Sequence, residues 1–366
     1  MADPQTLTVA VTGLNATDNP APGVAVIRAI REAPGFAGRI VGLAYDALDP
    51  GNYLQGIADA VYLMPYPSQG AEAVLDRLLY IHARTPLDVI VPTLDAELPA
   101  YIRIADQLLA HGIHTFLPSE EGFARRSKAR FHELQDKLGI PVPKSRTIAD
   151  SADVFRLHEE FSYPLMVKGQ FYDAYLAHSP MEAEALFQKV RAKWGLPVVV
   201  QEFVAGEEYD VVALGDGEGG LLGAVPMRKM QLTDKGKAWG GITIADPALE
   251  RFLQEAMSRL KWRGPLELEV MRAKKDGRLL LLEINPRFPA WVYLAVGAGQ
   301  NLPWAVVELA LGRKVAPLPP YRVGTLFLRH SHDVICPLAD YENLSIHGEL
   351  HREVADAEVE GRGNDA

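Results

Sequence analysis

The run LLLLEINPRF (residues 279–288) decides how the rest of the chain is interpreted. Four leucines predict a buried strand, because a short, continuous apolar run is typical of strands in a protein core. The run nevertheless ends in polar and charged side chains, those of Glu283, Asn285 and Arg287. A strand that ends in an acid, an amide and a guanidinium needs a chemical explanation.

The residues before this run predict that it is the second strand of a hairpin. The segment LELEVMRAKKDGRLLLLEINP (266–286) contains KKDG, which is a suitable turn between two strands. Side chains two residues apart on a strand share one face. Glu267 and Glu269 therefore lie on one face of the first strand, and Glu283 and Asn285 lie on one face of the second. If the strands pair across KKDG, Glu269 and Glu283 come close together.

Two neighbouring carboxylates in a protein core repel each other and are costly to desolvate. A divalent cation removes this conflict. Carboxylate and amide oxygens suit Mg²⁺, which usually also binds oxygens of nucleotide phosphates. The hairpin therefore predicts a Mg²⁺ site. The alternative is that Glu283 simply ends the strand in solvent beside Arg287.

The first 120 residues alternate β-rich runs with helical patterns, of which AEAVLDRLLYIHAR (71–84) is a clear amphipathic helix. This alternation predicts a parallel sheet with helices on both faces. The turn TGLNATDNPAPG (12–23) lacks G-x-G-x-x-G spacing, which disfavours classical NAD binding and leaves a Rossmann-like supporting domain. The expected strands are LTVAV (7–11), RIVGLAY (39–45), AVYLM (60–64), DVIVP (88–92) and HTFLP (114–118).

Further elements are expected downstream. Asn301 is the predicted N-cap of a helix over 301–312, and Gly312 is its stop signal. The acidic end 354–366 is expected to be mobile. The other predicted helices cover 127–139, 147–161, 181–195 and about 247–261, and the predicted strands lie in 163–169, 197–215 and 219–229.

Composition and charge exclude several classes of protein. The formal net charge of −10 argues against a nucleic-acid partner bound by phosphate neutralisation. No apolar run approaches the length of a membrane span, and the start lacks the pattern of a secretory signal. The one cysteine, Cys336, cannot form an internal disulfide. We therefore expect a reduced, cytoplasmic protein without a membrane partner.

In these features the chain resembles the ATP-grasp ligases, a family that includes biotin carboxylase, carbamoyl phosphate synthetase and D-alanine–D-alanine ligase. The resemblance covers about residues 1–315 and is most specific at 266–287. It implies an α/β fold class, with a Rossmann-like pre-ATP-grasp N-terminal domain followed by a two-subdomain α+β ATP-grasp fold. The implied domains are 1–120, 121–320 with a nucleotide cleft between 125–202 and 203–320, and a C-terminal β extension with a mobile acidic tail at 321–366.

The resemblance also implies roles for the residues of the hairpin. In the family, an acid or amide on one strand and an E-x-N-P-R-type segment on the next hold Mg²⁺ between the nucleotide phosphates. By this match Glu269, Glu283 and Asn285 ligate Mg²⁺, with Mn²⁺ as a substitute. Arg287 stabilises the phosphorylated intermediate.

A nucleotide site follows from the same resemblance. The segment VVVQEFVAGEEYDV resembles the hinge between the two subdomains of the family, where backbone groups bind the adenine edge. The implied adenine-binding residues are Gln201, Glu202 and Val204, and Glu208 would bind the ribose. Two lysines match phosphate-directed positions: Lys168, which ends the strand PLMVK, and Lys128.

Three further features are less regular. The family follows its strand lysine with a loop rich in glycine and serine, but here the run is KGQFYDAYLAHS, and no residue between 169 and 179 is assigned. Arg228 and Lys229 lie on a strand predicted to face the site, where a basic residue would meet the acyl phosphate or the substrate carboxylate. The alternative is a solvated pair. His330 and His332 have no further ligands nearby in the sequence.

The resemblance implies a two-step reaction. ATP phosphorylates a substrate carboxylate, and an amine attacks the acyl phosphate to form an amide, with release of ADP and phosphate. The partners would be small-molecule or peptide acids and amines, with amino acids preferred, and a homodimer is left open. Two alternatives remain: bicarbonate activation, as in carboxylases, and a non-catalytic ATP-binding regulatory subunit.

Overall fold

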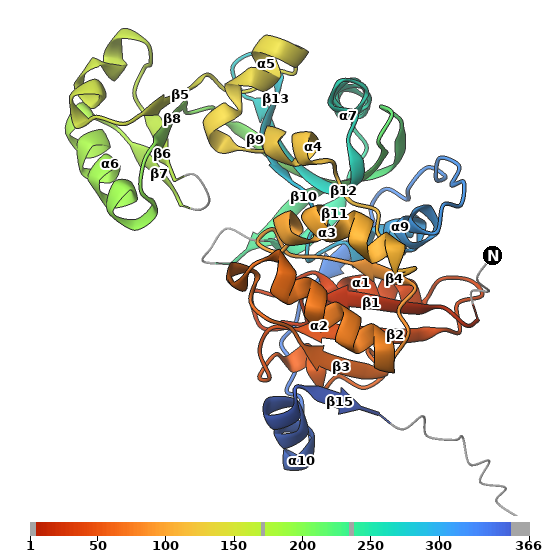
Figure 1. Cartoon of the computed structure of the whole chain (residues 1–366). Helices are drawn as coiled ribbons and strands as arrows, with labels where there is room; N and C mark the ends of the chain where they lie inside the picture. Colours follow the sequence, from red (N-terminus) through yellow and green to blue (C-terminus); the bar gives the residue numbers. More distant parts are fainter. Residues whose placement is uncertain (1–4, 170–172, 234–237, 353–366) are drawn as a thin grey trace, which may run out of the picture.

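The computed structural model describes residues 5–169, 173–233 and 238–352. Three sheets follow one another along the chain, each with its own helices (Figure 1). The expected mobility of 354–366 concerns residues outside the described part of the chain. No helix in the described ranges has the length and apolar character needed to cross a membrane.

The N-terminal sheet is parallel except at one edge. Its order is β15-β3-β2-β1-β4, and β15 pairs antiparallel with β3. Long crossover connections join the parallel strands, with α1 between β1 and β2, a 3₁₀ turn at Pro50–Asn52 between β2 and β3, and α2 between β3 and β4, so that the strands can run in one direction. The strands are β1 (Thr8–Thr12), β2 (Arg39–Ala44), β3 (Ala60–Leu63), β4 (Val89–Val91) and β15 (Glu349–His351), and the helices are α1 (Gly23–Arg31), α2 (Ala71–Arg84) and α3 (Leu98–Ala110).

The predicted strand 114–118 is wrong. Only His114 pairs with the sheet, through a single bridge to Val89. Phe116 and Leu117 are buried, and the carbonyl of Leu117 accepts a hydrogen bond from Arg263 Nη1 at 2.6 Å. The apolar run reflects packing between two parts of the chain and not a fifth parallel strand.

A small antiparallel sheet follows, in the order β5-β8-β6-β7. Its apolar face packs against α6 and a run of 3₁₀ turns at Ser151–Glu159. The helix predicted over 147–161 is therefore wrong, because its start belongs to β5 and its remainder is wound as 3₁₀ turns. The elements are β5 (Ser145–Ile148), β6 (Leu165–Lys168), β7 (Ala174–Ala177), β8 (Val198–Glu202) and α6 (Pro180–Trp194).

The third sheet has six antiparallel strands in the order β13-β12-β9-β10-β11-β14. The predicted hairpin is confirmed as its β12–β13 edge. The helix predicted over 127–139 is divided into a 3₁₀ turn at Lys128–Arg130 and α5. The strands are β9 (Gly206–Asp216), β10 (Leu221–Leu232), β11 (Ala238–Thr243), β12 (Arg263–Ala273), β13 (Leu279–Asn285) and β14 (Leu326–Leu328), and the remaining helices are α4 (Glu120–Arg125), α5 (His132–Leu138), α7 (Pro247–Leu260), α8 (Tyr293–Gly297), α9 (Leu302–Ala310) and α10 (Leu338–Glu342).

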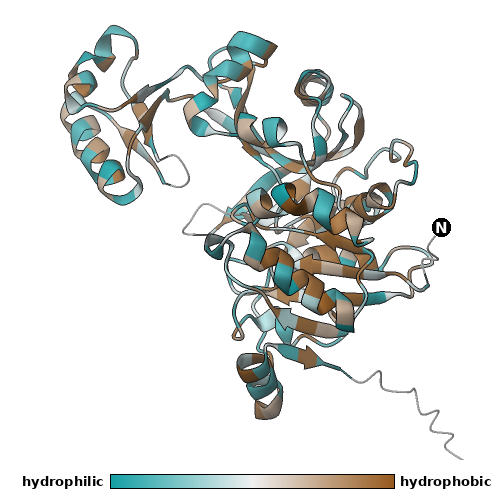
Figure 2. Ribbon diagram, viewed as in Figure 1, coloured by the Kyte–Doolittle hydropathy of each residue, from teal (hydrophilic) through white to brown (hydrophobic). Residues whose placement is uncertain are grey.

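The two larger sheets share one hydrophobic core. Residues of the N-terminal sheet, such as Val11, belong to the same buried cluster as Val212 of β9 and Trp291 near α8. Figure 2 shows the strands of the N-terminal sheet as predominantly hydrophobic and α6 as a mixture of hydrophilic and hydrophobic residues. The N-terminal sheet and the six-stranded sheet are thus packed against each other, while the small sheet has a separate core with α6.

Candidate active site

Glu269 and Glu283 face each other across the hairpin. They are direct partners in the antiparallel register of β12 and β13, and Glu267 is the partner of Asn285. Burial, and then the charge of Glu283, raise the pKa of Glu269 well above its usual range. Asn285 Nδ2 donates to Glu269 Oε1 at 3.4 Å and to Glu267 Oε2 at 3.2 Å. The structure therefore brings the three predicted metal-binding side chains together on one face.

These side chains fit a hard divalent cation. A buried carboxylate whose pKa is raised by a neighbouring carboxylate is the electrostatic situation that a bound cation relieves, and the three side chains offer carboxylate and amide oxygens as ligands. Within the described ranges, no group of three or more His, Cys, Asp and Glu side chains is arranged to hold a metal ion. His330 and His332 are exposed, and their rings are 6.4 Å apart. The better candidate is thus the set of two carboxylates and one amide.

Two lysines approach this face from outside the six-stranded sheet. Lys128 Nζ lies 3.2 Å from Glu283 Oε2. Lys168, at the end of β6, is partly exposed. Desolvation and then the nearby charge of Lys128 lower its pKa, while Glu283 and Glu269 oppose this effect. The small sheet therefore contributes a cation to the same cluster as the hairpin carboxylates.

Lys229 of β10 belongs to the same cluster of charged side chains, through two carboxylates of β9. Its Nζ lies 2.6 Å from Glu208 Oε1 and 3.1 Å from Asp210 Oδ2. Burial alone would lower the pKa of Lys229, but the carboxylates of Asp210, Glu269 and Glu208 raise it overall. Asp210 is almost fully buried, at 3% exposure, and the sequence analysis did not select it.

Arg228 was expected to face the site with Lys229, and this is wrong. Successive side chains on a strand point to opposite faces of a sheet. Lys229 takes the face of Glu208 and Asp210, so Arg228 lies on the other face, with Nη1 3.6 Å from Glu207 Oε1. Its side chain is 52% exposed. Arg228 is the solvated member of the pair.

The predicted hinge connects the small sheet to the six-stranded sheet, because β8 ends at Glu202 and β9 begins at Gly206. Gln201 is buried, and Val204 lies in the connection. Glu202 Oε1 accepts a hydrogen bond from the backbone N–H of Lys144 at 3.0 Å. This side chain is therefore used to join β8 to the residues before β5.

Arg287 is held between two acids that the sequence analysis did not assign to it. Its Nε donates to Asp95 Oδ2 at 2.9 Å, and its Nη1 donates to Glu267 Oε2 at 3.0 Å. Glu267 also accepts from Trp291 Nε1 at 2.8 Å. Asp95 follows the buried strand β4 in the run PTLDAE, and acids directly after a parallel strand were a signal in the sequence that could have identified it.

A family model described as "ATP-grasp in the biosynthetic pathway with Ter operon" matches residues 196–327, which include the hinge and both strands of the hairpin. This part of the chain matches the ATP-grasp family. The model thus covers Glu269, Glu283 and Asn285 on the ATP-grasp hairpin. The same range includes Lys229.

Relatives of this ATP-grasp chain share parts of its length. Chloroplastic phosphoribosylamine–glycine ligase from Arabidopsis thaliana is 30% identical in an alignment of 220 residues, and the match covers 52% of this chain and 41% of that protein. The chain spans about half or less of the length of the curated relatives it matches.

Solved structures confirm the ATP-grasp fold. The biotin carboxylase domain dimer of Hydrogenobacter thermophilus 2-oxoglutarate carboxylase, in complex with MgADP, ADP and bicarbonate, has a TM-score of 0.65 at 17% identity and covers 87% of this chain and 73% of that chain. L-amino acid ligase from Bacillus licheniformis has a TM-score of 0.62 at 19% identity, and covers 84% and 74%.

Proposed function

We propose that this ATP-grasp chain is an ATP-dependent, ADP-forming carbon–nitrogen ligase. It activates a carboxylate as an acyl phosphate and joins it to an amine. The observation that carries the proposal is the opposition of Glu269, Glu283 and Asn285 on one hairpin to the lysines Lys128 and Lys168. This arrangement suits a metal–triphosphate complex. The carboxylate and amide oxygens can bind the metal ion, and the lysines can bind the phosphate oxygens.

The proposed division of labour follows from position. Glu269, Glu283 and Asn285 would hold Mg²⁺, or Mn²⁺ as a substitute, which when bound neutralises charge on the phosphates. Lys168 and Lys128 orient the phosphates. The backbone near Gln201, Glu202 and Val204 is proposed to bind the adenine edge, with Glu208 at the ribose. The proposal of a nucleotide site is supported by the structural neighbour, which is described as a complex with MgADP.

Arg287 and Lys229 are proposed to act at the reacting carboxylate. A guanidinium fixed by two carboxylates is preorganised, so it can stabilise charge on a transferring phosphoryl group without large rearrangement. Lys229 is held in a similar way by Glu208 and Asp210. Arg228 has no part in the proposed reaction, because it lies on the opposite face of the sheet.

The acid is proposed to be an amino acid or a peptide carboxylate, and the amine a second small molecule. Two relatives support this preference: phosphoribosylamine–glycine ligase by its curated name, and L-amino acid ligase by its fold. A homodimer is proposed only because the structural neighbour is described as a dimer. Bicarbonate activation is the second candidate, and it is favoured by the bicarbonate bound to the same neighbour.

The test is ATP-dependent ADP release with panels of acids and amines, in Mg²⁺ and in EDTA. We expect release only with Mg²⁺ and with a matching acid, and loss of release in Glu283→Ala. Glu218→Ala is the control, because Glu218 is exposed in the turn between β9 and β10. Release with bicarbonate alone would favour the second candidate. Nucleotide binding without release, in all panels, would instead indicate a non-catalytic regulatory protein.

A further inference from the structure

Arg287 is attached to two different parts of the molecule. Glu267 lies on β12 of its own sheet, whereas Asp95 belongs to the loop after β4 of the N-terminal sheet. The side chains of Arg287 and Asp95 are 18% and 25% exposed. An ion pair with so little exposure is worth more than a surface pair, and it fixes the direction of a planar guanidinium.

The loop that carries Asp95 is fixed by hydrogen bonds to a buried carboxylate. Glu97 is fully buried, and its Oε1 accepts hydrogen bonds from the backbone N–H groups of Thr93 at 2.7 Å and Leu94 at 2.9 Å. Thr12 and Tyr45 also donate to its carboxylate. The loop that presents Asp95 is therefore tied to the ends of three strands, and its position is set by the N-terminal sheet.

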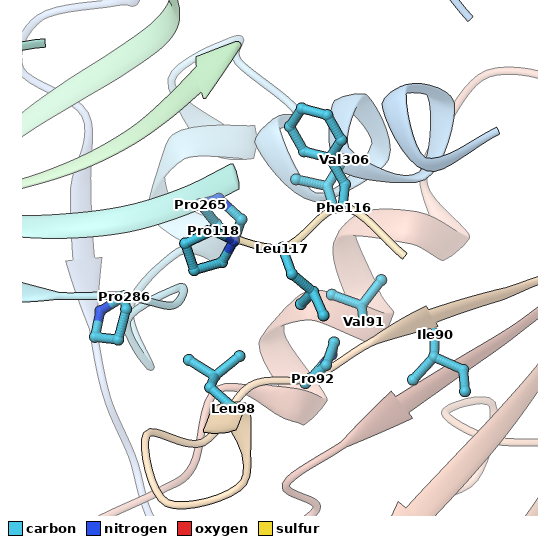
Figure 3. A pocket seen from close by; sticks show the side chains of 10 residues that line it. All are labelled: Ile90, Val91, Pro92, Leu98, Phe116, Leu117, Pro118, Pro265, Pro286 and Val306. Carbon is cyan, nitrogen blue, oxygen red and sulfur yellow. The ribbon is translucent and has the colours of Figure 1, made fainter. Parts of the chain in front are cut away.

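The loops that carry Asp95 and Arg287 both contribute apolar side chains to one pocket. A narrow pocket lies between the N-terminal sheet and the hairpin, and Pro92, Leu98 and Pro286 are among its lining residues (Figure 3). Pro92 and Leu98 flank the loop of Asp95, and Pro286 precedes Arg287. The lining side chains are apolar, so the pocket offers no chemistry of its own.

The second oxygen of Asp95 faces another cation. Arg126 Nη1 lies 3.7 Å from Asp95 Oδ1. Arg126 is two residues before Lys128, which reaches Glu283. The carboxylate of Asp95 is thus placed between the guanidinium groups of Arg126 and Arg287.

We propose that Asp95 is a positioning residue, which holds the guanidinium of Arg287 where it meets the transferring phosphoryl group. The inference rests on the proposed function. Asp95 does not touch the reacting atoms, but acts through Arg287. Its consequence is that the N-terminal sheet contributes directly to phosphoryl transfer. A purely structural ion pair would instead only stabilise the packing of the two sheets.

The test compares the affinities of two ligands that differ only by a mimic of the transferring phosphoryl group. MgADP reports nucleotide binding, and MgADP with aluminium fluoride adds a mimic of the transferring phosphoryl group, so no acid needs to be known. Titration calorimetry measures both affinities for wild type, Asp95→Ala and Asp95→Asn. We expect Asp95→Ala to weaken the aluminium fluoride complex by about tenfold, the size of a lost charge-assisted hydrogen bond, and to leave MgADP binding unchanged. Asp95→Asn keeps an acceptor, so its loss should be smaller.

The control is Asp106→Ala, because Asp106 is exposed on α3. Equal losses for both ligands in Asp95→Ala, or no loss in either variant, would overturn the positioning role. A wild type that binds MgADP but gains nothing from aluminium fluoride would overturn it as well. A wild type that does not bind MgADP would remove the proposed function itself, which is a separate result. If Asp95→Ala does not fold, the near-isosteric Asp95→Asn decides the question by the same comparison.

Discussion

Glu269 and Glu283 are direct cross-strand partners on β12 and β13. Directly opposed like charges destabilise a sheet. Lys128 forms an ion pair with Glu283 and offsets part of this repulsion, but the pKa of Glu269 stays raised. The chain therefore keeps an arrangement that is unfavourable by itself, and this makes ligand binding and stability depend on the same residues.

Metal-dependent nucleotide binding should be lost in Glu283→Ala. We expect the affinity for ATP in Mg²⁺ to fall at least about tenfold, the effect expected when even an outer partner of a metal site is removed. Titration calorimetry in Mg²⁺ and in EDTA measures this. Tight binding that is indifferent to both metal and Glu283 would contradict the metal site.

The pH dependence of stability should change in Glu269→Gln. Because the pKa of Glu269 is raised, the folded state keeps a proton that the unfolded state releases above about pH 4. This contribution to stability is therefore present at low pH and is lost as pH rises towards the folded-state pKa. Glutamine does not titrate, so the variant should gain on wild type by up to about 1.4 kcal/mol per pH unit in that window.

Urea denaturation in EDTA at pH 5 and pH 8 measures the free energies of unfolding. Parallel pH profiles for the two proteins would contradict the raised pKa. Added Mg²⁺ should stabilise wild type, because a ligand that binds only the folded state shifts the unfolding equilibrium. It should have much less effect on Glu269→Gln.

Lys229 and Arg228 form a matched pair for a stability test. Lys229→Met leaves the nearly buried Asp210 without its cation, and this should cost about 3 kcal/mol. Arg228→Met removes a partner of an exposed acid and should cost no more than about 0.5 kcal/mol. The midpoints of urea unfolding, measured for wild type and both variants, distinguish the two losses of stability. Similar losses in both variants would contradict the conclusion that Asp210 depends on Lys229 as its cation.

Lys168→Met should reduce nucleotide affinity without a comparable loss of stability. Desolvation and Lys128 already disfavour the Lys168 ammonium in the free protein, as its lowered pKa indicates. Bound phosphates would offset that cost. We expect affinity for MgATP to fall about tenfold, with Lys189→Met, on the exposed side of α6, as control. An unchanged affinity would remove Lys168 from the proposed phosphate site.

The hairpin could be predicted from the sequence because strand periodicity and its turn specify which side chains share a face. The pairing of Glu269 with Glu283 is confirmed, while their role as metal ligands stays a prediction. The same periodicity could have excluded one of Arg228 and Lys229, but only the register with β9 decides which.

Other features could not be derived from local patterns. The contact between Asp95 and Arg287 joins residues that are 192 positions apart, and no periodicity encodes it. The segment 147–161 has a helical composition, but pairing of its start with β8 removes those residues from any helix. The run 114–118 is apolar because it packs between the two larger sheets, and a strand pattern cannot be distinguished from such packing.

The pairing of β15 with β3 has a consequence for the order in which the protein folds. The ribosome releases β3 early, and its outer edge then has no neighbour until Glu349–His351 emerge. Arg77 Nη2 donates to the carbonyl of Gly348 at 2.8 Å, a contact that must wait for the same residues. An open strand edge is a site for unwanted pairing with other chains. The sheet to which β3 belongs is therefore completed only after the other two sheets have been synthesised, and the edge of β3 stays open while residues 64–348 are translated.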